Sequence, residues 1–164
     1  MSTPGHHVPG RLGVGFVGSG FNARFHMQAF QGVRDADVRG VWSPNLEHAS
    51  SAGALARSLD IGSAKAYASI RDMVADPLID ALWLTGPNHM RLENMEEIVY
   101  AIEGGVGTLR GIACEKPLAR NVAEAKRMLE LMKRTGAMQG YLENQVFAPQ
   151  IERASCRERV LRLV

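Results

Sequence analysis

The sequence predicts an α/β fold: a doubly wound, mostly parallel sheet with helices on both faces. Three observations lead to this prediction. Short apolar segments alternate along the chain with longer segments of helical periodicity. The first apolar segment, "LGVGFV", is almost continuously hydrophobic, which is typical of a strand buried on both faces. A glycine-rich turn then joins that strand to a helical pattern. Such alternation implies βαβ units with right-handed crossovers.

The first half of the chain is expected to alternate between strand and helix. A short helix after residue 69 ends before Pro77, because proline disfavours the α conformation at the residue before it. The expected elements are a strand at 12–17, a helix after the glycine turn, a strand at 38–42, a helix at 46–59, a helix at 70–74 and a strand at 79–85.

In the second half, a helix is expected after residue 90 because apolar residues recur there at helical spacing. The glycines at 104, 105 and 107 end it, and a strand is expected at 111–114. The face predicted to be buried carries Leu92, Met95, Ile98, Val99 and Ile102.

The last expected helix begins at Asn121, whose side chain can cap it, with Glu124 three residues on as in a capping box. Gly136 is a suitable C-terminal stop. A final strand is expected at 137–143. The stripe predicted to be buried consists of Val122, Ala125, Leu129 and Met132.

Composition limits the class of protein. The chain has 164 residues, 46% of them hydrophobic and 22% charged, which suits one soluble globular domain. A net charge of +2 argues against broad electrostatic binding of nucleic acid. No apolar run approaches the roughly 18 residues that span a bilayer, and no signal peptide is recognisable, so we expect a cytoplasmic protein. Cys114 and Cys156 lack metal-ligand spacing, which predicts free thiols and no metal site.

A G-x-G-x-x-A motif directly follows the first strand, at Gly18, Gly20 and Ala23. The first glycine permits a tight turn, the second lets the backbone approach a pyrophosphate, and the small third residue lets helix and strand pack closely. The helix N-terminus, at Phe21 and Asn22, supplies N–H groups and a positive dipole to the phosphates. The motif predicts dinucleotide binding. The alternative is a glycine-rich turn of another α/β fold, for instance one that binds S-adenosylmethionine.

Ser43 stands where the second strand of a dinucleotide-binding fold often ends in a carboxylate. A carboxylate there would bond the ribose hydroxyls of NAD and repel the 2′-phosphate of NADP. Because this carboxylate is absent, the 2′-phosphate of NADP is not repelled at this position. No arginine follows immediately to hold that phosphate. The predicted cofactor is therefore NADP or NAD, with a lean to NADP.

Pro87 and Asn88 follow the strand expected at 79–85. They lie at the carboxyl end of a parallel strand, where ligands bind in open α/β sheets. The alternative is an ordinary turn from strand to helix. The sequence leaves both open.

Lys116 lies between Glu115 and Pro117, directly after the strand expected at 111–114. A lysine at that strand end, beside a nicotinamide, could orient a carbonyl or hydroxyl and share its proton. Glu115 could hold the lysine or the cofactor, and Pro117 could fix the turn through a trans or a cis bond. Taken alone, the segment could also be a surface ion pair before a helix.

Together these segments resemble the N-terminal domain of the Gfo/Idh/MocA oxidoreductase family. "GFVGSGFNARFH", "IDALWLTGPNH", "ACEKPLARNVAEAKRMLELMKRTG" and "GYLENQVFAP" occur in order at suitable spacing, within residues 11–150. The resemblance implies a Rossmann-type domain followed by a larger α/β domain. It also implies a homo-oligomeric enzyme that oxidises or reduces sugars or polyols with NAD(H) or NADP(H).

The resemblance also implies a role for each candidate residue. Gly18, Gly20 and Ala23, with Phe21 and Asn22 between them, match the dinucleotide loop. Further matches are Ser43 at the position of the NAD-selecting aspartate, Pro87 and Asn88 beside the cofactor, Glu115 near the nicotinamide ribose, Lys116 as the catalytic lysine, and Asn144 near the hinge between domains.

Departures from the family pattern bear on the substrate side. Arg91 stands where many members have histidine, and Gln145 where many have arginine. His26, at a common family histidine, is interpreted as packing or phosphate-side support. The family's histidine acid/base belongs to the second domain, which we expect to be absent from this sequence.

The expected domain organisation is a disordered lead-in at 1–10, a dinucleotide-binding domain at 11–150 and a non-native tail at 151–164. The tail resembles a translated sequencing-adapter read joined to a broken gene. Three functions stay open: the cofactor half of an oxidoreductase, a non-catalytic dinucleotide sensor like the family's transcriptional co-repressor, and an inactive fragment. Lys116 favours the oxidoreductase, since a sensor has no chemical need for it.

Overall fold

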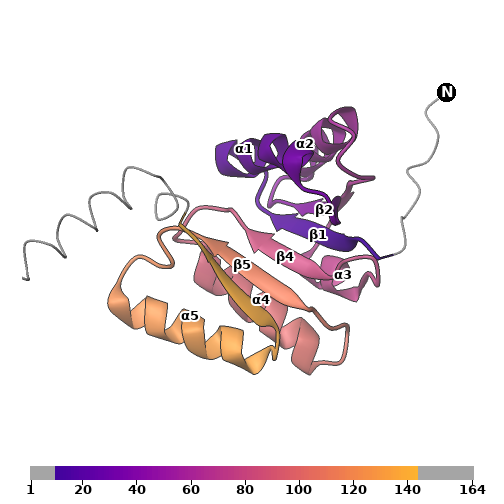
Figure 1. The fold of residues 1–164 in the computed structure, drawn as a ribbon. Helices are drawn as coiled ribbons and strands as arrows, with labels where there is room; N and C mark the ends of the chain where they lie inside the picture. The colour runs from indigo at the N-terminus through magenta and orange to yellow at the C-terminus, as the bar shows by residue number, and fades with distance from the viewer. Residues whose placement is uncertain (1–9, 144–164) are drawn as a thin grey trace, which may run out of the picture.

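The computed structural model describes residues 10–143 (Figure 1). Six parallel strands form one sheet in the order β3-β2-β1-β4-β5-β6, which confirms the doubly wound α/β fold. The elements are β1 (Leu12–Val17), α1 (Phe21–Ala29), η1 (Phe30–Gly32), β2 (Ala36–Trp42), α2 (Leu46–Ser58), β3 (Lys65–Tyr67), α3 (Ile70–Ala75), β4 (Ala81–Leu84), α4 (Arg91–Glu103), β5 (Gly111–Glu115), α5 (Val122–Arg134) and β6 (Met138–Leu142).

Part of the expected organisation lies outside the described residues. This holds for the lead-in up to residue 9 and for the tail at 151–164. It also holds for Asn144, Gln145 and Cys156. Within residues 10–143, no helix is both long and apolar enough to cross a membrane.

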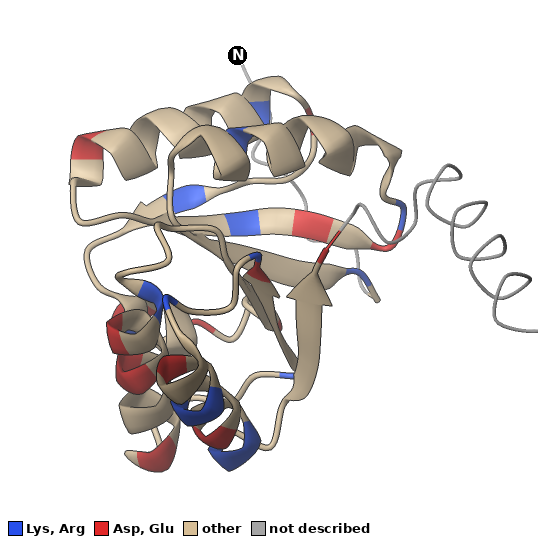
Figure 2. Cartoon of the chain, turned by 90° about the vertical axis from the view of Figure 1, so that its left-hand side faces the viewer, with Lys and Arg blue, Asp and Glu red and all other residues tan. Residues whose placement is uncertain are grey.

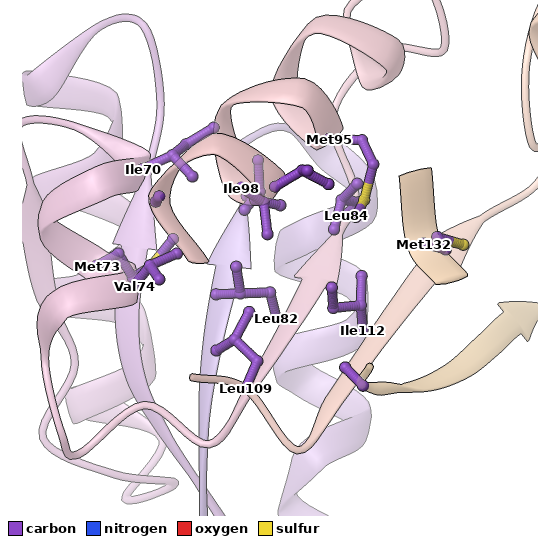
Figure 3. Packing of buried hydrophobic residues seen from close by; sticks show 14 of the residues in the cluster. Ile70, Met73, Val74, Leu82, Leu84, Met95, Ile98, Leu109, Ile112 and Met132 are labelled. Carbon is purple, nitrogen blue, oxygen red and sulfur yellow. The ribbon is translucent and has the colours of Figure 1, made fainter. Parts of the chain in front are cut away.

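The helices cover the two faces of the sheet as separate layers (Figure 1). One apolar cluster joins α1 and α2 to the sheet and includes Phe16, Met27 and Val38. The other joins α3, α4 and α5 to the opposite face, where Leu82 and Ile98 are among its fully buried side chains (Figure 3). Burying a side chain of this size contributes roughly 1.5–3 kcal/mol, so the two layers hold the sheet from both sides.

Strand β3 was not predicted from the sequence. It has only three residues, pairs with β2 through Gly40–Lys65, Val41–Ala66 and Trp42–Tyr67, and lies at the edge of the sheet. Its first residue, Lys65, is charged and exposed. Three residues are too few to show the alternation of apolar and polar side chains that predicts a strand. The other expected strands agree with the observed ones to within two residues at each end.

The buried face of α4 agrees with the prediction. Met95, Ile98 and Val99 are buried, and Leu92 and Ile102 are partly buried against the same cluster. Two polar residues, Arg91 and Asn94, are buried as well, although neither was among the residues predicted to be buried.

The buried stripe predicted for α5 is wrong in part. Met128, Leu131 and Met132 face the core, whereas Val122 is 72% exposed and Leu129 43% exposed. The apolar residues of this helix form two overlapping stripes at helical spacing, and its packing against α4 selects one of them. The capping prediction is confirmed, because the Asn121 side chain accepts a hydrogen bond from the N–H of Glu124 at 3.0 Å.

Charges of both signs are interleaved on the helices below the sheet (Figure 2). Arg134 pairs with Glu103 at 2.7 Å, and Arg127 lies 3.8 Å from Glu96, so that both pairs link α5 to α4. Exposed pairs of this kind contribute little to stability, because water and salt screen the attraction between the charges. This surface therefore presents mixed charge and not a basic stripe.

The strand order places β1 at the centre of the sheet, between β2 and β4. The chain leaves β1 toward α1 on one face and leaves β4 toward α4 on the other. Such a reversal opens a crevice at the carboxyl ends of the two strands, and ligands of open α/β sheets bind there.

Candidate functional site

A cavity of ≈ 710 Å³ lies at this reversal of strand order. The turns that follow β1, β2, β4 and β5 all contribute to its wall. Of the residues predicted from the sequence, the wall contains Gly18, Gly20, Phe21, Asn22, Ser43, Pro87 and Asn88. The structure thus brings together residues spread over seventy positions of sequence, in a space of the size that small-molecule ligands occupy.

Gly18 occupies a position that only glycine fits. Its φ is +124°, in a region that favours glycine, and a Cβ there would lie 2.7 Å from the backbone nitrogen of Gly86. The N–H of Gly18 donates to the carbonyl of Trp42 at 2.8 Å. The turn after β1 is therefore tied closely to the strands on both sides of it.

Gly20 differs from Gly18, because a Cβ added there would meet no protein atom within 4 Å. It is the N-cap residue of α1, and no side chain caps the helix. The first-turn N–H groups of α1, at Phe21 and Asn22, therefore have no side-chain partner at the cap and lie at the cavity wall. Ala23 is fully buried beneath them in the cluster that holds Phe16.

The turn after β2 contains no carboxylate before Glu47. Ser43 is half-buried at the cavity wall, and Asn45 caps α2 by accepting from the N–H groups of Glu47 and His48 at 2.8 and 3.3 Å. None of the described residues that line the cavity is aspartate or glutamate. The cavity wall therefore suits an anionic ligand.

Pro87 and Asn88 form a tight turn into α4. The carbonyl of Pro87 accepts from the N–H of Met90 at 3.0 Å, and that of Asn88 from the N–H of Arg91 at 3.4 Å. Both residues also line the cavity. The strand-to-helix turn and the position beside a ligand, which the sequence presented as alternatives, are compatible in this structure.

Glu115 is 7% exposed at the end of β5, and both of its carboxylate oxygens have partners. Oε1 lies 2.6 Å from Nε2 of His26, and Oε2 accepts from the N–H of Lys116 at 3.0 Å. The His26 ring packs on Trp83, with 5.0 Å between ring centroids. Of the two roles expected for His26, packing or support of the phosphate side, the structure shows packing on Trp83, and the polar contact of the ring is to Glu115 at the end of β5.

The Lys116 side chain is exposed and has no ion-pair partner within residues 10–143. The described residues thus give no support to a surface ion pair, the alternative that the sequence allowed. The peptide bond between Lys116 and Pro117 is cis. Pro117 lines the cavity, so the segment after β5 borders the same space as the glycine turn.

Arg91 is the functional candidate that sequence reasoning missed, since it appeared there only as a departure from a family pattern. It is the first residue of α4, is 3% exposed and lines the cavity. Its guanidinium donates to backbone carbonyls of Gly86, Glu115, Lys116 and Pro117. The available signal was its spacing from Asn94, Met95 and Ile98, which places Arg91 on the buried face of the helix.

Cys114 precedes this segment and is fully buried. Burial raises the pKa of its thiol to about 11, although the nearby Arg91 acts in the opposite direction. The thiol is therefore neutral at ordinary pH, as expected for a free structural cysteine. Within residues 10–143, no group of three metal-ligating side chains gathers.

The parallel sheet, the glycine turn and the cavity at the reversal of strand order define a Rossmann-type α/β domain. Residues 12–142 match the family model described as "Oxidoreductase family, NAD-binding Rossmann fold", the Gfo/Idh/MocA family. The chain belongs to this oxidoreductase family. The sequence resemblance is thereby confirmed.

Curated relatives are longer than this chain. An uncharacterized oxidoreductase of Rhizobium meliloti is 34% identical over 100 residues, which cover 61% of this chain and 26% of the relative. The 1,5-anhydro-D-fructose reductase of Ensifer adhaerens is 29% identical over 79 residues, covering 48% and 22%. The NADP-dependent scyllo-inositol 2-dehydrogenase of Bacillus subtilis (strain 168) is 21% identical over 136 residues, covering 83% and 38%. The chain thus spans well under half the length of these relatives.

Solved structures share the fold. The myo-inositol dehydrogenase of Lactobacillus casei, in complex with NAD(H) and myo-inositol, aligns with a TM-score of 0.73 at 22% identity, over 92% of this chain and 42% of that one. The biliverdin reductase of Synechocystis sp. PCC 6803, in complex with biliverdin and NADP⁺, aligns with a TM-score of 0.62 at 21% identity, over 83% and 39%. At these identities the likeness is one of fold.

Proposed function

We propose that this chain is the cofactor-binding part of an NAD(P)-dependent oxidoreductase that acts on CH–OH groups of sugars or polyols. One observation carries the proposal: the glycine turn, the uncapped N-terminus of α1 and the segment after β5 border a single cavity. Two curated relatives support the substrate class, since their names are those of an anhydro-sugar reductase and an inositol dehydrogenase.

The phosphate end of the cofactor is assigned to the turn after β1. The open space at Gly20 lets the backbone approach a pyrophosphate, and the N–H groups of Phe21 and Asn22 face it with the positive end of the α1 dipole. Ala23 keeps α1 close to the sheet. Ser43, at the end of β2, is assigned to the adenosine ribose, where its neutral side chain accepts NADP as well as NAD.

The nicotinamide end is assigned to the turns after β4 and β5. Pro87 and Asn88, which line the cavity, would border the ring, and Glu115 would lie near the nicotinamide ribose. The cofactor supplies or accepts the hydride at C4 of its ring when it is bound. Lys116 hydrogen-bonds the oxygen of the substrate CH–OH group and thereby orients it for that transfer. Asn144, outside the described residues, is kept as a residue near the hinge to a second domain.

The whole enzyme is a larger protein in this proposal, because the chain spans well under half of its curated relatives. A second domain then supplies the further acid/base and most substrate contacts. A homo-oligomeric state and a cytoplasmic location remain predictions made from the sequence and the family resemblance.

Calorimetric titration of the chain with NADH, NADPH and S-adenosylmethionine tests the proposal. We expect both dinucleotides to bind and S-adenosylmethionine to give no heat of binding. Binding of S-adenosylmethionine without either dinucleotide would establish the alternative that the glycine motif left open.

A further inference from the structure

Arg91 is a buried cation whose charge has no carboxylate partner within residues 10–143. Burying a guanidinium is costly unless its donors are satisfied. The hydrogen-bond partners of the Arg91 guanidinium therefore indicate what this buried charge does beside the cavity.

The Arg91 guanidinium donates to backbone carbonyls from two separate parts of the chain. Nε donates to the carbonyl of Gly86 at 3.1 Å, in the turn after β4. The two terminal nitrogens donate to three consecutive carbonyls that begin with the last residue of β5: those of Glu115, Lys116 and Pro117. The rigid, planar fork of a guanidinium suits this task, because its donors diverge in one plane.

The segment Glu115–Pro117 is therefore held from two directions. Arg91 holds its backbone, and His26 holds the Glu115 carboxylate through the 2.6 Å contact. The Lys116 N–H is also fixed, by its bond to Glu115 Oε2. Within this segment, the side chain of Lys116 is exposed to solvent and has no hydrogen-bond or ion-pair partner among the described residues.

We propose that Arg91 is a positioning residue that presets the Glu115–Pro117 segment beside the cavity, before any cofactor binds. The inference rests on the proposed function for its chemical meaning, since a preset segment fixes the starting point of the Lys116 side chain relative to the nicotinamide. Arg91 is also the only lysine or arginine among the described residues that line the cavity. The effect of its hydrogen-bonding geometry therefore has to be separated from the effect of its positive charge.

Two variants separate the two effects. Arg91→Lys keeps a positive charge but replaces the diverging fork by a single ammonium group. Arg91→Met removes both. Arg71→Met is the matched control, because Arg71 is an exposed arginine on α3 outside the cavity wall. If Arg91→Met does not fold, Arg91→Lys carries the comparison.

The first measurement uses no ligand. Amide hydrogen exchange, followed by NMR in the ¹⁵N-labelled chain, reports on the Lys116 N–H, and the buried amide of Phe16 in β1 reports on global unfolding. We expect exchange at Lys116 to become at least ~10-fold faster in both Arg91 variants, by local opening that leaves Phe16 unchanged. Arg71→Met should match the wild type. Unchanged exchange at Lys116 in both Arg91 variants would overturn the proposal, and an effect in Arg91→Met alone would assign the role to charge instead.

The second measurement adds NADPH to the same proteins after ¹³C-methylation of their lysines, which stand at 65, 116, 126 and 133 in the wild type, with one more at position 91 in Arg91→Lys. NADPH is added to the wild type and to the Arg91→Lys variant until each protein is saturated, so that a difference in affinity does not enter the comparison. The Lys116 methyl signal should shift in the wild type and not in the variant. Two results together would separate the two proposals. If the wild type bound no dinucleotide, the proposed function would be overturned. If the Lys116 amide nevertheless exchanged faster in the Arg91 variants, the assignment of Arg91 as a positioning residue would stand.

Discussion

Nε2 of His26 lies 2.6 Å from Oε1 of Glu115, although the two residues are 89 positions apart in the sequence. His26 belongs to α1, the helix that begins at the glycine turn, and Glu115 ends β5. The contact therefore links the element proposed to bind the phosphates to the segment proposed to face the nicotinamide. Trp83 of β4 packs against the imidazole and fixes its position.

Removing this imidazole should weaken cofactor binding without altering the glycine turn. A hydrogen bond to a charged group contributes about 1.5–3 kcal/mol, so we expect His26→Ala to lower the affinity for NADPH by ~10-fold. His26→Gln, which keeps a donor, should recover part of the loss. Calorimetry with His89→Ala as the control, an exposed histidine outside the cavity wall, checks the expectation. Equal affinities for all three variants would show that Glu115 needs no partner on α1.

Gly20→Leu should abolish dinucleotide binding while leaving the fold intact. A Cβ at Gly20 meets no protein atom within 4 Å, so the added side chain occupies the space assigned to the pyrophosphate and not the core. We expect a loss of affinity of at least ~100-fold, or about 2.7 kcal/mol. Gly32→Leu is a matched control, because its Cβ also meets nothing within 4 Å and it lies outside the cavity wall.

The two Gly20 and Gly32 proteins are best compared by calorimetry together with urea unfolding. Both should unfold at the same denaturant concentration as the wild type to within the error of the method. If Gly20→Leu bound NADPH as tightly as the wild type, the phosphates would lie elsewhere. Gly18 is unsuitable for this test, since a side chain there would meet the backbone of Gly86 and disturb the fold.

The elements that the sequence predicted well are those with local signals. The apolar run of β1, the glycine turn and the Asn121 cap each depend on a few neighbouring residues, and all agree with the structure. The cavity follows from them, because a parallel sheet with a reversal of strand order gathers the ends of its central strands.

The features that the sequence did not predict depend on distant contacts. Which stripe of α5 is buried depends on its packing against α4, and both stripes have helical spacing. The short edge strand β3 takes its conformation from pairing with β2. Arg91 appeared in the sequence only as a departure from the family pattern, because three of the carbonyls that it binds belong to residues 24 to 26 positions further along the chain.

Ser43→Asp should shift cofactor preference from NADP toward NAD. A carboxylate at the end of β2 repels the 2′-phosphate and bonds the ribose hydroxyls, and we expect the ratio of the two affinities to change by ~10-fold or more. Ser50→Asp on α2 adds the same charge at an exposed position outside the cavity wall and controls for long-range repulsion. Titrating both proteins and the wild type with NADPH and NADH gives the ratios. A wild type that already prefers NADH strongly would contradict the lean to NADP.

The buried thiol of Cys114 should make stability fall at high pH. Burial raises the pKa of Cys114 from 9.0 to about 11, so the unfolded chain loses this proton at lower pH than the folded chain. The stabilisation is present in full below pH 9 and is lost as the pH rises toward 11, by roughly 2 kcal/mol. Urea unfolding at pH 8 and pH 10.5 measures the change. In Cys114→Ala that part of the pH dependence should disappear, and an identical slope in both proteins would rule out Cys114 as its source.

Lys116 should be needed for chemistry but not for cofactor binding, and this chain alone should turn over sugars and polyols only very slowly. A positioned acid or base contributes roughly 10²–10⁴-fold to a rate, and Lys116 is an exposed side chain without a hydrogen-bonding partner among the described residues. In the proposed enzyme, a second domain holds the substrate against it.

Absorbance of the reduced cofactor, followed with NAD or NADP and a panel of sugars and polyols, measures turnover, while calorimetry measures binding. We expect Lys116→Ala to bind NADPH as the wild type does, with Lys126→Ala on the exposed side of α5 as the control. Fast turnover by the wild type that disappears in Lys116→Ala, and not in Lys126→Ala, would show that residues of this chain, or of a second copy of it, complete the site by themselves.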